Sequence, residues 1–200
     1  MKQIKSEFIP PQKKGSSMHV QSGVAAETEA HAKLIYQRSV ERLLNVNAWG
    51  TYSSPSKFQL FDENRNKTDR LVEEGDFIRI DIPGLGTEAG MGYDWVRVEA
   101  IGRAEDENYE WTAIRVRPSS MPCSKSEVIA HFLDKDATST FKVSREGYLV
   151  FAEEFARNET TNTNGVGLLD MARNFLVGAA AKLGVSYPQW KSLTDGLLQN

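Results

Sequence analysis

The sequence predicts an α+β fold, in which an antiparallel sheet of about six or seven strands packs against a long C-terminal helix, with a further helix near the N-terminus. Three observations predict it. Helical periodicity is confined to the two ends of the chain, at residues 24–44 and beyond residue 165. Between residues 57 and 156, short stretches alternate apolar and polar residues. The connections between these stretches are short, which favours antiparallel pairing.

Composition excludes several classes of protein. The chain has 200 residues, one Cys and a net charge of -3. It lacks the roughly 18 consecutive apolar residues that a membrane-spanning helix needs. A single Cys cannot form an internal disulfide, so we expect a cytoplasmic protein. The net negative charge argues against a nucleic-acid partner that is bound through bulk charge.

The first 23 residues are predicted to be a flexible basic tail, followed by a single α+β domain over residues 24–200. The tail contains four Lys against one Glu, two adjacent prolines and no apolar period. We therefore expect that deletion of Met1–Ser17 leaves the stability almost unchanged. Val24–Leu44 is the first predicted helix. Trp49 follows it and is expected to fold back onto the core.

Six stretches are predicted as strands. In three of them, one set of alternate residues is apolar, and the opposite set carries Trp, Arg and acidic residues. Pro118 and Pro122 interrupt the pattern. The predicted strands are Phe58–Phe61, Asp76–Ile82, Tyr93–Ile101, Trp111–Arg117, Thr138–Ser144 and Tyr148–Ala156.

Gly165–Leu183 is predicted as the long C-terminal helix, because its apolar residues recur at helical spacing. Its Gly178–Ala181 segment is unusually small, which favours close packing against the sheet or the first helix. A short final helix is predicted from Pro188 to Leu198, with Trp190, Leu193 and Leu197 as its buried residues.

This order of elements, from Val24 to Leu183, resembles the START/polyketide-cyclase-like helix-grip superfamily. The resemblance rests on element order and on the passage from the Thr138 strand to the Leu183 helix, without a sequence motif. It implies that the sheet is curved and encloses a cavity against the C-terminal helix. It also implies a small apolar ligand in that cavity. The superfamily begins with a strand before its first helices, and here only Met18–Gln21 is available for it.

The second face of the predicted sheet is the candidate ligand-binding site. One interpretation is a solvated face on which Arg and carboxylate pairs cover the aromatic rings. The other is a binding face with Trp as a platform and Arg as a clamp. The candidate residues are Arg79, Tyr93, Trp95, Arg97, Trp111 and Arg115.

Other motifs predict no catalytic residue, metal site or cofactor. The glycine-rich Gly84–Gly92 segment precedes a strand, so it lacks the helix N-terminus that binds a pyrophosphate. It is interpreted as a hairpin connection, or else as a mobile flap that contacts a ligand through Glu88, Met91 and Tyr93. The three His have no metal-ligand spacing. Cys123 lies in a loop without an evident base.

Three functions remain open. The first is a binding protein that holds a small hydrophobic or amphipathic ligand between the sheet and the C-terminal helix. The second is a protein-interaction module that uses an exposed Trp/Arg face. The third is a cyclase- or hydrolase-type enzyme, which ranks last. An apolar cavity would favour the first, a flat aromatic patch the second, and a buried polar cluster around His131 the third.

Overall fold

The computed structural model describes residues 8–53, 55–82, 87–122, 127–162 and 187–199. Within them, seven strands form one sheet in the order β1-β7-β6-β5-β4-β3-β2. All six neighbouring pairs are antiparallel, as predicted. The strands are β1 (Ser16–Ala25), β2 (Lys57–Phe61), β3 (Phe77–Asp81), β4 (Asp94–Asp106), β5 (Tyr109–Pro118), β6 (Thr138–Glu146) and β7 (Leu149–Glu159).

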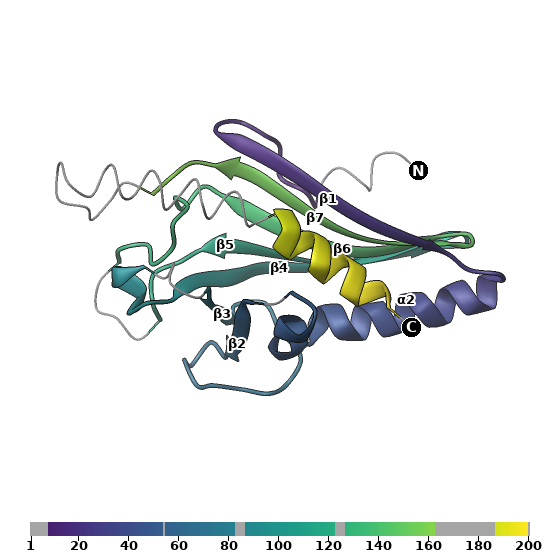
Figure 1. Ribbon diagram of the computed structural model, residues 1–200, viewed down its shortest axis with the longest axis horizontal. Coiled ribbons are helices and arrows are strands. Elements are labelled where there is room, and N and C mark those ends of the chain that lie inside the picture. Colours follow the sequence, from purple (N-terminus) through teal and green to yellow (C-terminus); the bar gives the residue numbers. More distant parts are fainter. Residues whose placement is uncertain (1–7, 54, 83–86, 123–126, 163–186, 200) are drawn as a thin grey trace.

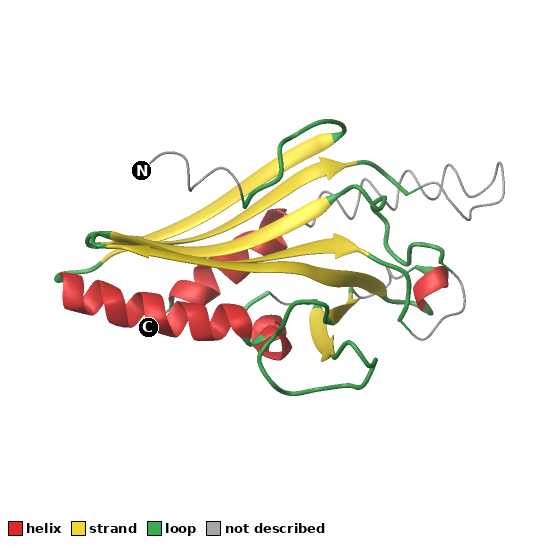
Figure 2. Cartoon of the chain, turned by 180° about the vertical axis from the view of Figure 1, so that it is seen from behind, coloured by secondary structure: helices red, strands yellow, loops and turns green. Residues whose placement is uncertain are grey.

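Two helices cover one face of this sheet, which we call the inner face (Figures 1 and 2). They are α2 (Glu29–Leu44) and a C-terminal helix over residues 187–198. Both contribute to a core with the inward residues of the strands. The opposite side is the outer face. The predicted α+β helix-grip architecture is therefore confirmed, whereas the predicted Gly165–Leu183 helix lies outside the described residues.

Helix α2 begins at Glu29 and not at the predicted Val24. Thr28 caps it, because its hydroxyl oxygen accepts the backbone N–H of His31 at 3.1 Å. Residues 24 and 25 belong instead to β1. After α2, the short 3-10 helix η1 (Val46–Thr51) turns the chain back. It buries Trp49 to 1% exposure, which confirms the predicted packing of this ring on the core.

The predicted tail is wrong over residues 16–23. These residues form most of β1, which pairs with β7 along its whole length. Val20 and Ser22 face inward between exposed neighbours. A single buried Val in a polar stretch is too weak a pattern to predict a strand, and the pairing partner lies more than a hundred residues away. Residues before β1 also contact the body: the Lys13 and Lys14 backbone N–H groups donate to Oδ1 of Asn158 at 2.7 and 3.2 Å.

A β-bulge in β4 changes which residues face the core. Val98 pairs with Val116, but the next pair is Ala100 with Arg115, so Glu99 is an extra residue. Beyond it the alternation is inverted. Ala100, predicted to point inward, lies on the outer face, and Ile101 packs against the core instead.

The C-terminal helix is held by its buried leucines and by hydrogen bonds from α2 and β1. Its Leu193 and Leu197 are buried as predicted, whereas Trp190 is only partly buried. The Arg42 guanidinium of α2 donates to the backbone carbonyls of residues 196, 197 and 199 at its end. From β1, the hydroxyl of Ser22 hydrogen-bonds Thr194 at 2.8 Å. These contacts fix the helix over the inner face.

Candidate functional site

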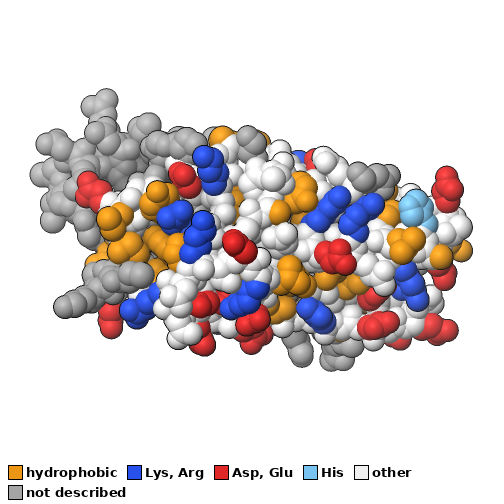
Figure 3. Space-filling model, turned by 90° about the horizontal axis from the view of Figure 1, so that it is seen from below, with side chains coloured by type: hydrophobic (Ala, Val, Ile, Leu, Met, Phe, Trp, Pro, Cys, Tyr) orange, Lys and Arg blue, Asp and Glu red, His pale blue; other side chains and the backbone are white. Residues whose placement is uncertain are grey.

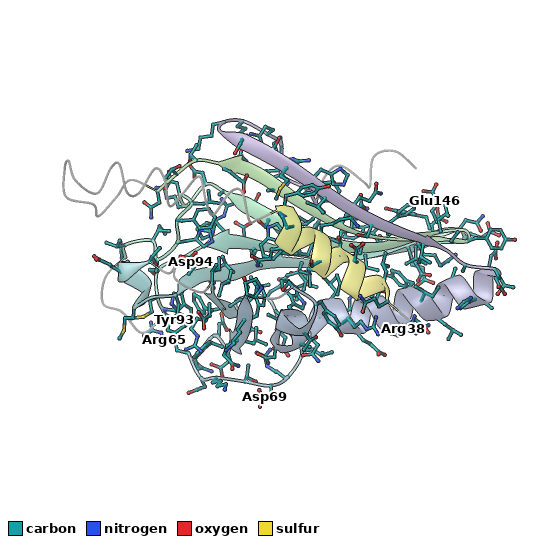
Figure 4. The ribbon with its side chains drawn as sticks, viewed as in Figure 1. Arg38, Arg65, Asp69, Tyr93, Asp94 and Glu146 are labelled. Carbon is teal, nitrogen blue, oxygen red and sulfur yellow. The ribbon has the colours of Figure 1, made fainter. Side chains whose placement is uncertain are left out.

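A cavity of about 50 Å³ lies between the inner face and the C-terminal helix. It is at the end of the sheet where β4 and β6 begin and where β5 and β7 end. Figure 4 shows this end by Asp94, far from Glu146 at the opposite end of the sheet. The sequence predicts a ligand between the sheet and the Gly165–Leu183 helix, which lies outside the described residues, whereas this cavity lies against the final helix through Gln189 and Trp190.

Aromatic rings form one wall of the cavity. Trp49 lies with its ring centre 4.7 Å from that of Phe141 and 5.6 Å from that of Phe58. Its indole N–H donates to the Leu43 carbonyl at 3.0 Å, so the ring is fixed by both packing and a hydrogen bond. Trp190 of the C-terminal helix adds a ring 5.0 Å from Phe141. Aliphatic residues complete this wall, namely Ile78, Ile80, Ile82, Val96, Val116 and Leu133.

Polar residues reach the cavity from strand ends and one loop. Asp94 starts β4, Ser139 lies near the start of β6, and Glu159 ends β7. His131 comes from the loop after β5, and Gln189 from the C-terminal helix. Asp94 is 1% exposed and His131 is 7% exposed. The lining is thus amphipathic, with its polar groups supplied from one end of the sheet.

The loop that carries His131 is held by Asn162. The Asn162 side-chain amide donates to the carbonyls of Ile129 and His131 at 3.1 and 3.0 Å. Within the loop, Nδ1 of His131 accepts the backbone N–H of Leu133 at 3.0 Å. A neutral His131 ring that accepts at Nδ1 carries its proton on Nε2. The imidazole is therefore fixed in orientation and tautomer.

Glu154 is a third acidic group on the inner face, and it pairs across the sheet with the cavity residue Phe141. It is fully buried and lies in register between Val20 of β1 and Phe141 of β6. Burial, and next the nearby charge of Glu159, raise the pKa of Glu154 to about 8. The Ser139 hydroxyl favours the ionised form as a nearby hydrogen-bond donor. Within the described part of the chain, neither carboxylate oxygen has a partner at ordinary hydrogen-bond geometry.

Burial also raises the pKa of Glu159. The Ser16 hydroxyl opposes this effect through a hydrogen bond to Oε2 at 3.3 Å. Asp94, Glu154 and Glu159 were missed as candidate residues, although the sequence contains a signal for two of them. Asp94 continues the inward set of Val96 and Val98, and Glu154 interrupts the inward alanines of β7. An acid at an inward position of an alternating strand is that signal.

The predicted outer-face site does not form as one surface. Trp95 and Trp111 lie on the predicted face, but they are 5% and 6% exposed, so the prediction of exposed Trp platforms is wrong. Phe61 covers Trp95, with ring centres 5.1 Å apart. Phe8 covers Trp111 at 5.4 Å. A phenylalanine ring from another segment thus covers each of the two indoles.

The charged candidates separate into local groups. The Arg79 guanidinium lies over the Tyr93 ring, 4.3 Å from its centre. Arg115 pairs with Glu99 at 2.8 Å and donates to the Phe8 carbonyl at 2.9 Å. Arg97 keeps a side chain that is 54% exposed. Binding of a ligand by these residues stays a prediction. On the face of the molecule seen in Figure 3, acidic and basic side chains are interspersed.

The glycine-rich loop is described only from residue 87 onward. Its 3-10 turn η2 (Glu88–Gly90) is closed by a hydrogen bond from the Gly92 N–H to the Thr87 carbonyl at 2.8 Å. Gly90 packs on Trp95, where an added Cβ would lie 3.1 Å from the indole ring. This half is therefore a closed turn with Met91 exposed. Residues 83–86 and Cys123 lie outside the described residues.

Comparison with solved structures finds the following similarities to this chain. A hypothetical protein from Helicobacter pylori has a TM-score of 0.55 and 10% identity, over 92% of this chain and 87% of that chain. A START superfamily protein from Mycobacterium smegmatis has a TM-score of 0.39 and 11% identity, over 92% and 99% of the two chains. Norcoclaurine synthase from Thalictrum flavum has a TM-score of 0.34 and 8% identity, over 88% and 99%. No family model and no curated protein matches the sequence.

Two searches of the described residues bear on other kinds of site. None of the helices in the described part of the chain is long and apolar enough to cross a membrane. In the same residues, no three His, Cys, Asp or Glu side chains are grouped so as to hold a metal ion.

Proposed function

We propose that the protein binds a small amphipathic molecule in the cavity between the inner face and the C-terminal helix. The cavity lining carries the proposal, because it combines an aromatic and aliphatic wall with Asp94, His131, Ser139, Glu159 and Gln189. Apolar walls with a few placed polar groups are typical of small-molecule sites. The walls take up the apolar part of the ligand, and the polar residues orient its head group.

The volume of the cavity limits the size of the ligand. A cavity of 50 Å³ holds only a few water molecules, at about 10–15 Å³ for each. It therefore fits a short-chain molecule, or the head of a longer one. A longer ligand has to displace the Trp190 ring, which is only partly buried. Replacement of Trp190 by Ala is therefore expected to favour longer chains.

The four Trp indole N–H groups are built-in reporters of the binding site. Trp49 and Trp190 line the cavity, whereas Trp95 and Trp111 lie on the outer face. We expect titration with 1-butanol, followed by ¹⁵N NMR, to shift the indole signals of Trp49 and Trp190 only. Shifts confined to Trp95 and Trp111 would contradict the proposal and favour the outer face.

A cavity-filling variant tests the same site independently. Val116→Phe fills the cavity from its sheet side, so it should abolish the 1-butanol shifts. The matched control is Leu34→Phe on α2, at a position that is 64% exposed, and it should bind as the wild type does. Unchanged binding by a folded Val116→Phe protein would overturn the proposal.

One observation favours a second candidate, an acid–base enzyme of the cyclase or hydrolase type. His131 has a fixed tautomer and lines the same cavity as the buried Asp94. For such an enzyme, His131→Ala should abolish turnover of a bound substrate while leaving its affinity nearly unchanged. A binding protein would instead return the ligand chemically intact from both the wild type and the variant.

A further inference from the structure

We propose that the open part of the outer face, over β2, β3 and the start of β4, binds a planar aromatic ring that carries a phosphate group. This site lies on the side of the sheet opposite the cavity, so it is independent of the proposed function. Its anchor is Arg79, a partly buried arginine without an acidic partner among the described residues. Three partly exposed rings surround it, those of Phe61, Phe77 and Tyr93.

The partners of Arg79 distinguish it from the other arginines that β3, β4 and β5 place on the outer face. Arg115 and Arg117 both pair with Glu99, at 2.8 and 2.6 Å. For Arg79, no described carboxylate oxygen lies within 4 Å of the guanidinium, and no described group accepts a hydrogen bond from it. A guanidinium is always charged and has five N–H donors. The donors of Arg79 are therefore available to an anion.

Two aromatic rings hold the Arg79 guanidinium in place. Its central carbon Cζ lies 4.3 Å from the centre of the Tyr93 ring and 5.7 Å from that of the Phe61 ring. Phe61 in turn packs on Trp95, with ring centres 5.1 Å apart. Contact with the rings stabilises the cation but satisfies none of its N–H groups. Arg79 therefore presents a positioned set of donors, and a phosphate can accept two of them at once.

The register of the strands places a second arginine beside Arg79. In the β3–β4 pairing, Arg79 is opposite Trp95 and Phe77 is opposite Arg97. The two arginines are therefore diagonal neighbours on one side of the sheet, about 7–8 Å apart, and their long side chains can meet on one phosphate. Glu63 lies 3.9 Å from Arg97 and is 71% exposed, so this surface pair is weak and a bound phosphate can replace it.

The acid closest to Arg79 along β3 is Asp81, two positions further on the same side of the sheet. It lies opposite Lys57 in the β2–β3 pairing. Opposite charges at directly paired positions attract each other. Lys57 therefore offsets the charge of Asp81, and the positive charge of Arg79 remains available to a ligand.

The aromatic surface beside these cations favours a ligand with a ring over a bare anion. Phe61 and Phe77 are opposite each other in the β2–β3 pairing, and both side chains are partly exposed. The Arg97 guanidinium lies 5.7 Å from the centre of the Phe77 ring. A planar ring can therefore stack here while its phosphate reaches the guanidinium groups. Figure 3 shows hydrophobic and basic side chains next to one another at the end of the molecule that carries Tyr93 in Figure 4.

The experiment titrates the full chain with phenyl phosphate, phenol and inorganic phosphate, and follows the Trp indole groups by ¹⁵N NMR. We expect phenyl phosphate to shift the signal of Trp95, because Phe61 contacts both this ring and Arg79. The signal of Trp111 should stay unchanged. Phenol lacks the charge and inorganic phosphate lacks the ring, so each should bind at least about tenfold more weakly than phenyl phosphate.

Three variants locate the site. Arg79→Met keeps the apolar stem of the side chain and removes its charge, so the affinity for phenyl phosphate should fall at least about tenfold. Arg97→Ala should lower this affinity by a smaller factor. The matched control is Arg103→Gln, which removes the same charge from β4 beyond the bulge, where the alternation is inverted. It should bind phenyl phosphate as the wild type does.

Equal affinities for phenyl phosphate and inorganic phosphate would overturn the assignment of an aromatic ligand. Shifts confined to Trp49 and Trp190, or an equal loss of affinity in Arg79→Met and Arg103→Gln, would overturn the site on the outer face. If Arg79→Met fails to fold, Arg97→Ala decides, because that side chain is 54% exposed and its removal should leave the fold intact. Wild-type affinity in folded Arg97→Ala would then overturn the inference. The 1-butanol titration tests the cavity separately.

Discussion

Glu153 and Glu154 are neighbours on β7, yet they lie in opposite environments. Glu153 points to the outer face, where Lys142 lies at 2.9 Å and His19 at 3.1 Å. Glu154 points to the inner face, where no described side chain hydrogen-bonds its carboxyl at ordinary geometry. One residue along a strand thus separates a paired carboxylate from an unpaired one. The acid on the outer face is thus paired with basic side chains, whereas the acid on the inner face is fully buried.

The tryptophans show the opposite contrast between the two faces. Trp49 on the inner face is packed between two rings and has a partner for its N–H group. Trp95 and Trp111 on the outer face are buried as well, but neither indole nitrogen has a hydrogen-bond partner among the residues that the structure describes. The inner ring belongs to the main core, whereas the outer rings are covered by single side chains from elsewhere in the chain.

The largest expected effect comes from comparing the two kinds of Trp. Trp49→Ala should lower the free energy of unfolding by about 3–5 kcal/mol, because it leaves a large hole in the core. Trp111→Ala should cost less, about 1–3 kcal/mol, because one partly exposed ring covers it. Urea denaturation of both variants measures the difference. An equal loss of stability would mean that the two faces contribute equally to the core.

The second prediction concerns how the free energy of unfolding depends on pH through Glu154, with Glu153 as the control. Glu154 has a pKa of about 8 in the folded protein, above its ordinary value of 4.5. Between these values the folded form binds more protons than the unfolded form, so stability falls as the pH rises. The slope contributed by this group is up to about 1.4 kcal/mol per pH unit.

Thermal unfolding from pH 5 to pH 8 checks this slope. Glu154→Gln should flatten the curve, because an amide does not titrate. Glu153→Gln should leave the fall of stability with rising pH unchanged, because Glu154 is still present. A wild-type curve that rises through this range would contradict the pKa assigned to Glu154.

The third prediction concerns the cover of the outer face. Phe8→Ala should cost about 1–2 kcal/mol and expose Trp111, which shifts the Trp emission to longer wavelength. Phe8 packs on Trp111 and lies under the Arg115 guanidinium, so several contacts are lost together. This expectation replaces the sequence-based one, in which loss of the first residues has almost no effect. Unchanged stability and Trp emission in Phe8→Ala would instead support the sequence-based prediction of a flexible N-terminal tail.

The smallest expected effect is that of Arg97→Ala. The side chain is 54% exposed, and its nearest acid, Glu63, is 3.9 Å away, so stability should change by less than about 0.5 kcal/mol. Arg115→Ala should cost more, because Arg115 bonds both Glu99 and the Phe8 carbonyl. Chemical denaturation distinguishes the two. A large effect at Arg97 would show that the open part of the outer face has a structural role.

The sequence predicts the sheet and its two faces well, because alternation is a local property. The inward set of Ile78 and Ile80 and the outward set of Trp95 and Arg97 both lie as predicted. The exposure of the side chains on the outer face was predicted poorly, because it depends on which distant segment of the chain covers that face. Nothing around Trp111 indicates that a ring a hundred positions earlier will lie on it.

The candidate site shows the same limit. Trp49 and the final helix were predicted as core elements from local pattern. The cavity between them arises only when η1, four strand ends and the C-terminal helix are assembled. Asp94 and Glu154 are not among the candidates named from the sequence. Their inward register is visible in the sequence, but their lack of solvent is a tertiary property.

The bulge at Glu99 has a consequence for the whole of β4. One extra residue transfers every position from Ala100 to Asp106 to the other side of the sheet. The outer side of that segment therefore presents small residues, and Gly102 lies so close to Phe8 that an added Cβ would be 2.5 Å from its ring. The two halves of β4 therefore have different roles. The half before the bulge lines the cavity, and the half after it packs against the N-terminal segment through Gly102. One inserted residue reverses the orientation of all seven side-chain positions from 100 to 106, which would otherwise take a substitution at each position.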